Sequence, residues 1–580
     1  MEEQIMKKML TLVLALALAL TSATALAADL PDWLNTETAY PAVKEGGPDV
    51  TVSILTTRNS TATNDIEDVW FGKYLEEVMH VDLELEQTLE TQQRISLMFA
   101  SNDLPDLVWG IGLSNSDVMM YGEEEGMLLN WNDLLTEELM PNAVKAMEDY
   151  PDAFAASTTP AGNIYTLPMI SGSRYHANTG SFSCTIRMYV NQDWLDACGL
   201  TVPTTLDEYL NMLRAFKEKD PMGLGENNIP LIGNQNKDKE FVWNALGFIG
   251  TATNCWGTSF AIKDRQVALP CYTEEAKEFI RFYNTLYTEG LISPDYFTLD
   301  QTAARGLMAS GVCGVLGDST LAAVGDNWQP WVALAPLTSD VNDTSVASMN
   351  SPYQTGILYA SADTEHPEVL ARIVDYLYSD EGALLYFYGP MKDGDAPLLG
   401  VDGWTMTDTG AVTTEKVTNG EFTDISEYTY QYIKFYSSAP GRFDRYSQEA
   451  ARMAGVPYTG EIIPITDKLT GAVMESLVMD AVTDDNNDGH WRTTQAEAMV
   501  NNLTSIRLPS VYLSAEESQR VADLSTVIND YVTSETAKFI VGARPLDELD
   551  AYFAELKDLG IEEYIDIYTN AWAGYIATIQ

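Results

Sequence analysis

The segment from residue 50 to residue 109 alternates between short apolar runs and helix-like stretches, and this alternation limits the fold of the chain more than any other feature. Residues 50–54 and 81–85 carry an apolar side chain at every second position, which is the period of a half-buried strand. The apolar run Leu107–Trp109 follows a second helix-like stretch around 95–98. Strand, helix, strand, helix, strand predicts a parallel sheet with crossover helices.

Helix signals recur along the rest of the chain. Thr205 with Glu208, and Ser514 with Glu517, have the spacing of a capping box before an amphipathic run. Pro545 opens a further amphipathic stretch. These patterns predict an α/β protein whose C-terminal third is rich in helices.

The chain is long and strongly acidic. Its 580 residues are 46% hydrophobic, which is enough to bury a large core and excludes a disordered chain. It has 85 Asp and Glu against 33 Lys and Arg, a formal net charge of −52. This charge repels nucleic acid and acidic membranes, so neither is an expected partner. A strongly anionic ligand would need a local basic pocket.

The N-terminus has the features of an export signal. The run 9–20 is apolar apart from one threonine and follows two lysines, and Ala25–Ala27 supplies the small residues of a cleavage site. We therefore expect a signal peptide at 1–27, with Met1 or Met6 as the start codon, and an extracytoplasmic protein, secreted or associated with the cell surface. The cleavage site lacks the cysteine that would carry a lipid anchor.

Sequence motifs for catalysis are absent. The four histidines form no H-E-x-x-H pair, and the chain has no G-x-S-x-G or phosphate-binding loop. The odd number of cysteines leaves at least one free thiol, and we predict buried apolar roles for most of them. These five residues are Cys184, Cys198, Cys255, Cys271 and Cys313.

Several segments resemble one known family. Tyr189–Leu195, followed by Gly199–Leu200 and Pro203–Thr205, resembles the central region of extracellular solute-binding proteins of the family-1 type. Four more stretches resemble the same family in order and spacing, from about residue 50 to the end. These stretches are 102–106, 163–168, 287–292 and 537–542.

The resemblance implies a two-lobe periplasmic-binding-protein-like fold of type II, a hinge of two or three crossings, and a ligand held between the lobes. It implies a monomeric binding protein and no enzyme, which captures a small molecule, in most relatives a carbohydrate, for the permease subunits of an ABC transporter. The prolines and glycines in and around residues 28–46 predict a short extended leader there. The family topology places lobe 1 at 47–167 plus 345–388, and lobe 2 at 168–340 plus 389–580.

Calcium is the one metal that the resemblance raises. In sugar-binding relatives the stretch 220–230 is a calcium loop, but Met222 and Leu224 stand here where oxygen ligands are needed. We therefore expect no cofactor, and leave calcium as an alternative at one D-x-N-x-D-G turn whose twelfth position is Gln495. The candidate residues of this turn are Asp484, Asn486 and Asp488.

Aromatic side chains are the strongest indication of the ligand. The chain has 12 Trp and 30 Tyr, and flat rings stack on the apolar faces of sugars. Ligands of open α/β sheets lie beyond the carboxyl ends of the strands. On this basis the candidate ligand-binding residues are Arg58, Asn59, Trp109, Trp256, Trp328, Trp331, Tyr353, Gln354 and Trp404. An alternative role for Arg58 is one half of a structural ion pair.

Three hypotheses follow for function. The first is an importer-associated protein that binds an uncharged sugar or oligosaccharide, with an anionic ligand requiring calcium or basic residues such as Arg174, Arg442 and Arg445. The second is a related binding protein for a peptide or another nonsugar solute. The third is an extracellular glycan hydrolase, for which an abundance of carboxylates gives no specific support.

Overall fold

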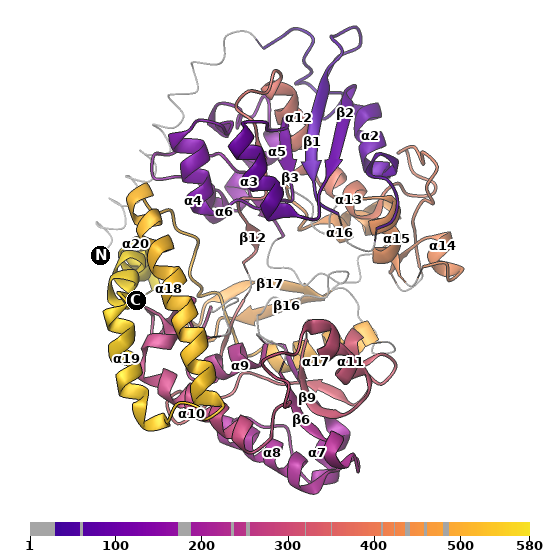
Figure 1. Ribbon diagram of the computed structural model, residues 1–580. Coiled ribbons are helices and arrows are strands. Elements are labelled where there is room, and N and C mark those ends of the chain that lie inside the picture. Colours follow the sequence, from indigo (N-terminus) through magenta and orange to yellow (C-terminus); the bar gives the residue numbers. More distant parts are fainter. Residues whose placement is uncertain are drawn as a thin grey trace. The chain divides into compact units, whose positions relative to one another are not determined.

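The computed structural model describes residues 30–58, 62–171, 187–233, 237–250, 256–318, 321–349, 351–407, 410–422, 424–435, 441–456, 461–479 and 487–579 (Figure 1). The expected signal peptide at 1–27 lies outside these ranges. The chain forms two compact units. The first unit comprises Met1–Gly172 and Tyr353–Tyr458, and the second comprises Ser173–Pro352 and Thr459–Gln580. The chain therefore passes between the units three times.

The first unit is built on a four-stranded sheet. β1 (Thr51–Thr56) lies between β2 (Asp82–Gln87) and β3 (Leu107–Trp109) and is parallel to both. β13 (Leu358–Ala360) adds an antiparallel strand beside β3. α2 (Trp70–Met79) connects β1 to β2, and α3 connects β2 to β3. The predicted strand–helix alternation is therefore confirmed, and it places the carboxyl ends of three strands at one edge.

The other elements of the first unit surround this sheet (Figure 1). The helices are α3 (Thr91–Ser101), α4 (Asn115–Val118), α5 (Pro141–Asp149), α6 (Pro151–Ser157), α12 (Pro367–Leu377), α13 (Asp380–Tyr388), α14 (Glu415–Thr418), α15 (Ile425–Tyr432) and α16 (Tyr446–Met453). The short strands are β4 (Met169–Ile170), β12 (Tyr353–Gln354), β14 (Thr405–Met406) and β15 (Val412–Thr413). Single turns are η1 (Ile66–Asp68), η2 (Met119–Glu124) and η3 (Trp131–Asp133).

Residues 389–458 belong to the first unit, whereas the family topology suggested the second. Trp404 is fully buried, and its indole N–H donates to the carbonyl of Gly389 at 3.0 Å. Phe435 packs edge-on against Trp109, with ring centroids 5.5 Å apart. Trp70 of α2 donates to the carbonyl of Pro397 at 2.9 Å. The boundary differs because aromatic side chains of this segment complete the core around β3 and α2.

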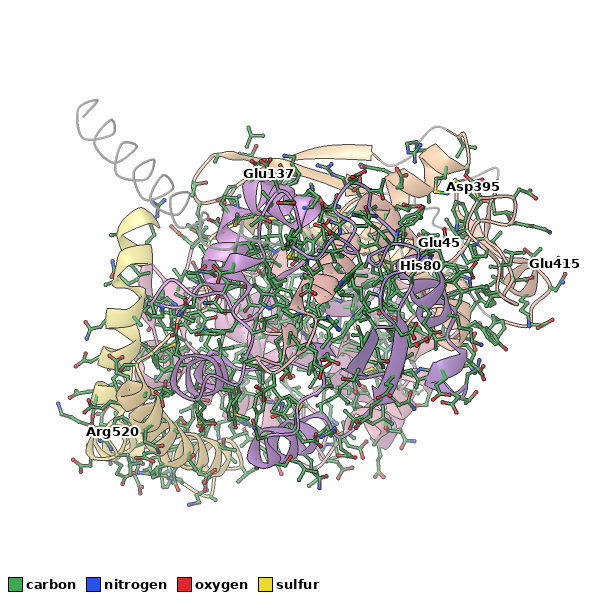
Figure 2. All side chains as sticks on the ribbon, turned by 90° about the horizontal axis from the view of Figure 1, so that it is seen from above. Glu45, His80, Glu137, Asp395, Glu415 and Arg520 are labelled. Atoms are coloured by element: carbon green, nitrogen blue, oxygen red, sulfur yellow. The ribbon has the colours of Figure 1, made fainter. Side chains whose placement is uncertain are left out.

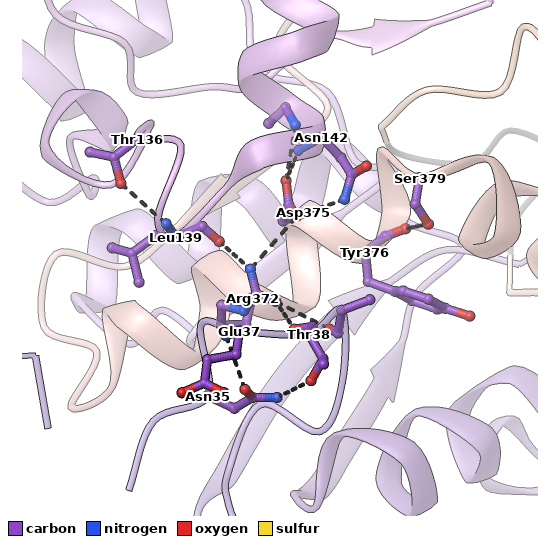
Figure 3. Close-up of polar contacts among 12 residues, drawn as sticks. Asn35, Glu37, Thr38, Thr136, Leu139, Asn142, Arg372, Asp375, Tyr376 and Ser379 are labelled. Carbon is purple, nitrogen blue, oxygen red and sulfur yellow. Dashed lines mark hydrogen bonds and ion pairs between the residues drawn. The ribbon is translucent and has the colours of Figure 1, made fainter. Parts of the chain in front are cut away.

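The expected leader lies against the first unit through a buried ion pair (Figure 3). Arg372 of α12 is 2% exposed and donates to the carbonyls of Thr38 and Leu139, the latter at 2.7 Å. Asp375, one helical turn on, accepts from the backbone N–H groups of Asn142 at 2.7 Å and Ala143 at 2.9 Å. These two N–H groups belong to the first turn of α5 and have no partner within that helix. One pair of side chains therefore joins the leader, α5 and α12.

The second unit contains a sheet in the order β10-β5-β9-β6. β9 (Cys313–Gly317) is parallel to β6 (Ile229–Ile232) and antiparallel to β5 (Met188–Asn191). β10 (Trp331–Ala333) is antiparallel to β5. β6, β9 and β10 therefore run in the same direction, and their carboxyl ends share one edge of the sheet.

Helices make up most of the remaining second unit. They are α7 (Gln192–Cys198), α8 (Leu206–Lys219), α9 (Lys237–Ala245), α10 (Glu274–Thr288), α11 (Gln301–Ala309), α17 (Asn487–Met499), α18 (Ala515–Ile540), α19 (Leu549–Asp558) and α20 (Ile561–Ile579). The strands outside the main sheet are β7 (Ala261–Lys263), β8 (Gln266–Ala268), β11 (Ala347–Ser348), β16 (Glu461–Thr466), β17 (Val473–Met479) and β18 (Leu503–Thr504). Single turns are η4 (Gly225–Asn227), η5 (Pro270–Tyr272), η6 (Ala322–Val324) and η7 (Leu546–Glu548).

The helix-rich C-terminal third is confirmed. α18 packs against α10 and α20, and the three C-terminal helices lie together along one side of the unit (Figure 1). The predicted capping boxes at Thr205 and Ser514 both form. The amphipathic run after Pro545 is followed by one more helix, α20. No helix among the described residues is both long and apolar enough to cross a membrane.

Charged side chains stand on the outside of each unit. Glu137 and Glu415 of the first unit and Arg520 of the second are all exposed (Figure 2). Arg520 pairs with Glu563, with Nε 2.7 Å from the carboxylate. This arrangement agrees with a solubilising role for most of the negative charge.

The three described cysteines are free and buried, as predicted. These are Cys198, Cys271 and Cys313. Burial raises the pKa of the Cys313 thiol to about 12, and that of Cys271 is also raised by burial. The thiolate is the reactive form. In a variant with Cys184→Ser and Cys255→Ser, we expect no reaction with a disulfide reagent at pH 8 while folded, and three reactive thiols in denaturant. A rapid reaction of the folded variant would contradict this burial.

Candidate functional site

The carboxyl edge of the second unit's sheet is closely covered by side chains. Gly233 directly follows β6, and a Cβ there would lie 1.9 Å from Cε2 of Tyr296. Gly317 ends β9, and a Cβ there would lie 2.8 Å from the Cβ of Lys237. Both positions need glycine because Tyr296 and the first turn of α9 contact the strand ends directly. This edge is where ligands of parallel sheets bind.

A buried lysine lies between two aromatic rings at this edge. Lys239 of α9 is 3% exposed, and its Nζ lies 4.6 Å from the ring centroids of both Trp256 and Tyr296. Trp256 is nearly parallel to Phe297, with a centroid separation of 6.3 Å and an interplanar angle of 6°. Trp256 is half-buried and Phe297 is 40% exposed. A flat aromatic surface next to a cation therefore reaches solvent here.

Asp238 fixes the ring of Tyr296, which lies next to this surface. It is 1% exposed, and its Oδ2 accepts hydrogen bonds from the hydroxyls of Tyr296 at 2.6 Å and Tyr283 at 2.9 Å. Burial, followed by the charge of Asp238, raises the pKa of Tyr283 well above its ordinary value, so this hydroxyl stays a donor. Oδ1 of Asp238 has no hydrogen-bond partner among the residues that the structure describes. The position of the Tyr296 ring is therefore set by a buried carboxylate.

The first unit presents a different set of groups at its carboxyl edge. Arg58 follows β1 and is 5% exposed. Its guanidinium donates to the carbonyl of Asn64, and Nη2 lies 3.5 Å from the carbonyls of Tyr430 and Gln431. Burial lowers the pKa of Arg58, while the charge of Asp65 opposes this shift. Within the described residues no carboxylate forms an ion pair with it, so the structure does not place Arg58 in the structural ion pair considered as an alternative.

Three of the predicted ligand residues are core residues. Trp109 and Trp404 have no exposed surface, and Trp331 is 2% exposed. The ring of Trp109 stacks on Tyr386 at a centroid distance of 5.5 Å. Their indole rings are enclosed by the protein and offer no face to a sugar, which removes them from the ligand contacts.

Trp328 lies at the wrong edge of its sheet. Trp331, the first residue of β10, follows Trp328 closely in the chain. It pairs with Asn191, the last residue of the antiparallel strand β5. This end of the sheet is the amino edge of β6, β9 and β10. Trp328 is half-buried, and its ring centroid lies 5.1 Å from that of His490. Of the predicted tryptophans in this unit, Trp256 is the one at the carboxyl edge.

The remaining predicted residues lie in other places. Tyr353 and Gln354 form β12, paired with β4, where the chain re-enters the first unit. Asn59, Asp484 and Asn486, together with the side chain of Asp488, lie outside the described residues. Arg442 is buried and ion-paired with Asp149 and Asp444, each at under 3 Å.

The loop after α8 is held together by its first residue. The carboxylate of Asp220 accepts from the backbone N–H groups of Leu224 at 2.9 Å and Gly225 at 2.8 Å. Its oxygens are thus used to hold the turn. No cluster of three or more potential metal-ligating His, Cys, Asp or Glu side chains exists in the described part of the chain.

Sequence reasoning missed Lys239 and its neighbours. The run Lys237–Glu240 consists of four charged residues, a composition typical of a solvated surface, yet its last three residues are less than 10% exposed. The sequence signal for a site here is the position of the run, which comes shortly after the strand at 229–232. Extending the strand-end rule to this strand would have identified it.

Two surface hollows of the second unit lie away from these groups. One, of about 410 Å³, lies between α10 and α19, and the other, of about 500 Å³, is lined by residues around Lys263 and Asn342. None of the predicted ligand residues lines either hollow. We therefore base the site on the strand edges.

Comparison with known proteins identifies the family. Residues 70–384, more than half of the chain, match the family described as bacterial extracellular solute-binding protein. The chain belongs to this family. The fructooligosaccharide ABC transporter substrate-binding protein FusA of Streptococcus pneumoniae is 24% identical over 508 residues, covering 86% of this chain and 85% of FusA.

Two solved structures share the fold. An HMO-binding, ABC-transporter-associated solute-binding protein of Bifidobacterium longum infantis has a TM-score of 0.71 at 19% identity, covering 91% of this chain and 99% of the other. An EF-hand mutant of FusA with fructo-nystose has a TM-score of 0.68 at 22% identity, covering 91% and 100%. The expected two-lobe α/β fold of a solute-binding protein is thereby confirmed, in a family of binding proteins.

Proposed function

We propose that this protein binds an oligosaccharide outside the cytoplasm and delivers it to the permease subunits of an ABC importer. The observation that carries this proposal is the Trp256–Phe297 surface beside Lys239 at the carboxyl edge of the second unit's sheet. Flat rings stack on the C–H faces of sugars, and fixed polar groups nearby select the hydroxyls. The names of FusA and the HMO-binding protein support a saccharide as the ligand.

The same proposal extends to the state of the protein in the cell. It acts as a monomer after export, its ligand leaves chemically unchanged, and binding needs no cofactor. Calcium is the metal to test at Asp484, Asn486 and Asp488, because these residues have the D-x-N-x-D-G spacing of a calcium turn. Reducing-sugar release from polysaccharides would instead favour the hydrolase hypothesis, and heat on mixing with peptides would favour a nonsugar solute.

Trp256→Ala is expected to weaken binding of the cognate oligosaccharide by about 10- to 100-fold, because loss of one stacked indole removes roughly 1.5–3 kcal/mol of apolar burial. Isothermal titration of a panel of oligosaccharides, first with the unaltered protein and then with the variant, measures this change. Trp256→Phe should retain most of the affinity.

Trp328→Ala is the matched control. Trp328 is also a half-buried loop tryptophan of the second unit, but it lies at the opposite edge of the sheet. We expect its affinity to stay within twofold of the unaltered protein. Equal losses from the two alanine variants would contradict the placement of the site, and no binding of any saccharide would contradict the proposed function.

A further inference from the structure

The first unit contains two buried cations that lack a carboxylate partner. Arg58 and Lys434 are each 5% exposed. Nε of Arg58 is buried with no hydrogen-bond partner among the described residues. The ammonium of Lys434 makes no hydrogen bond or ion pair within the same described ranges. Its contacts are with two rings, Phe387 at 4.7 Å and Tyr430 at 4.6 Å.

Buried cations without a carboxylate partner are unusual in such an acidic chain. With 85 Asp and Glu against 33 Lys and Arg, carboxylates are abundant. The other two buried arginines of the unit are paired: Arg372 lies 3.8 Å from Asp375, and Arg442 lies 2.8 Å from Asp444. A buried charge without a counter-ion is costly, so its retention needs a reason.

Arg58 lies at the carboxyl edge of the first unit's sheet, and the segment that carries Lys434 contacts the same edge. Arg58 follows β1 and reaches the carbonyl of Tyr430, whose ring lies under Lys434. Phe435, which follows shortly after the end of α15, contacts Trp109 at the end of β3. The carbonyl of Ile433 accepts from the N–H of Phe71 at the start of α2. The segment 430–435 is thus held against the strand ends, where ligands bind.

We propose that the first unit binds the carboxylate of an acidic saccharide, with Arg58 and Lys434 as the positive groups that receive it. This proposal rests on the proposed function, and it replaces the expectation of an uncharged ligand. The Nε–H of Arg58, which has no hydrogen-bond partner among the described residues, can donate to a carboxylate, and a lysine acts as a point charge. Together they form the local basic site that the net charge of −52 makes necessary for an anionic ligand.

Burial lowers the pKa of the Lys434 ammonium to about 7, and the charge of Asp424 opposes the shift. Without a ligand, part of this lysine is therefore neutral near pH 7, and an adjacent carboxylate would favour its charged form.

The test compares oligouronides with their own methyl esters, which have the same sugar skeleton without the charge. The probes are trimers of galacturonate, mannuronate and glucuronate, titrated calorimetrically into the full mature chain. We expect at least one oligouronide to bind tenfold or more tightly than its ester. Lys434→Met should remove this preference, so that the oligouronide and its ester bind with affinities within about threefold of each other.

Lys434→Met is suited to the test because it replaces an unpaired buried charge with an apolar side chain of similar shape, so we expect an unchanged or raised melting temperature. Lys416→Met is the control: Lys416 also lies over a ring, Tyr432 at 5.3 Å, but its side chain is 37% exposed and paired with Glu421. It should leave the preference intact.

The outcomes separate this inference from the proposed function. Tight binding of a neutral oligosaccharide with weaker binding of every oligouronide would overturn the inference alone. An acid preference that survives Lys434→Met and Arg58→Lys would overturn the assignment of these two residues. No binding of either class would overturn both the inference and the proposed function.

Discussion

Asp375→Ala is expected to lower the free energy of unfolding of the first unit by about 3–5 kcal/mol, because it breaks a buried ion pair and leaves Arg372 without its counter-ion. Asp375 is 1% exposed and accepts from both the backbone and the side chain of Asn142, the latter at 2.8 Å, and from Ala143 (Figure 3). Burial raises the pKa of this carboxyl, while the donors and Arg372 oppose the shift. Differential scanning calorimetry of the full chain measures the loss.

Asp550→Ala provides the control for a surface ion pair. Asp550 lies 2.8 Å from Lys277, but its side chain is 89% exposed, so we expect a change within about 0.5 kcal/mol. Asp375→Asn keeps one acceptor for α5 and should fall between the two. If Asp375→Ala cost no more than Asp550→Ala, the buried network would not hold the leader, α5 and α12 together.

Trp404→Ala is expected to cost about 3–5 kcal/mol of unfolding free energy, the range for removing a large buried aromatic side chain. The ring has no exposed surface, and its N–H bond to Gly389 is lost as well. The backbone N–H of Trp404 donates to the carbonyl of Pro390, and its carbonyl accepts from the N–H of Lys392, each at 2.9 Å. These bonds hold the backbone in place, so we expect the cavity to stay open. Thermal unfolding should show the loss in the transition of the first unit.

The same variant distinguishes a core residue from a ligand contact. Measured at 15 °C, where the variant is still folded, its affinity for the cognate oligosaccharide should stay within threefold. An affinity loss of tenfold or more with unchanged stability would return Trp404 to the ligand site. Trp256→Ala should show the reverse pattern, because Trp256 is half-buried at the strand edge.

Local patterns predicted much of the fold correctly. The alternating residues 50–54 and 81–85 became the parallel strands β1 and β2, and the capping boxes at Thr205 and Ser514 formed. Strand periodicity and helix caps involve neighbours within about four positions, so the sequence shows them directly. The resemblance to solute-binding proteins rested on similar short segments, and the family comparison confirmed it.

The ligand site was predicted less well, because loop tryptophans look alike in a sequence. Trp109, Trp256, Trp328 and Trp404 were equal candidates, yet burial removed two and sheet direction moved a third to the opposite edge. The charged run Lys237–Glu240 has the composition of a solvated surface, and Lys434 belongs to no recognisable motif.

By itself, then, the sequence determined the α/β class, the strand–helix alternation of the first crossovers, the capped starts of two helices and the family. Only the tertiary structure decided which aromatic rings are enclosed, which unit receives residues 389–458, and which cations lack a counter-ion. The physical reason is that burial and charge pairing depend on contacts between distant segments, such as Phe435 against Trp109 and Arg58 against Tyr430. Such contacts leave no period or spacing in the chain.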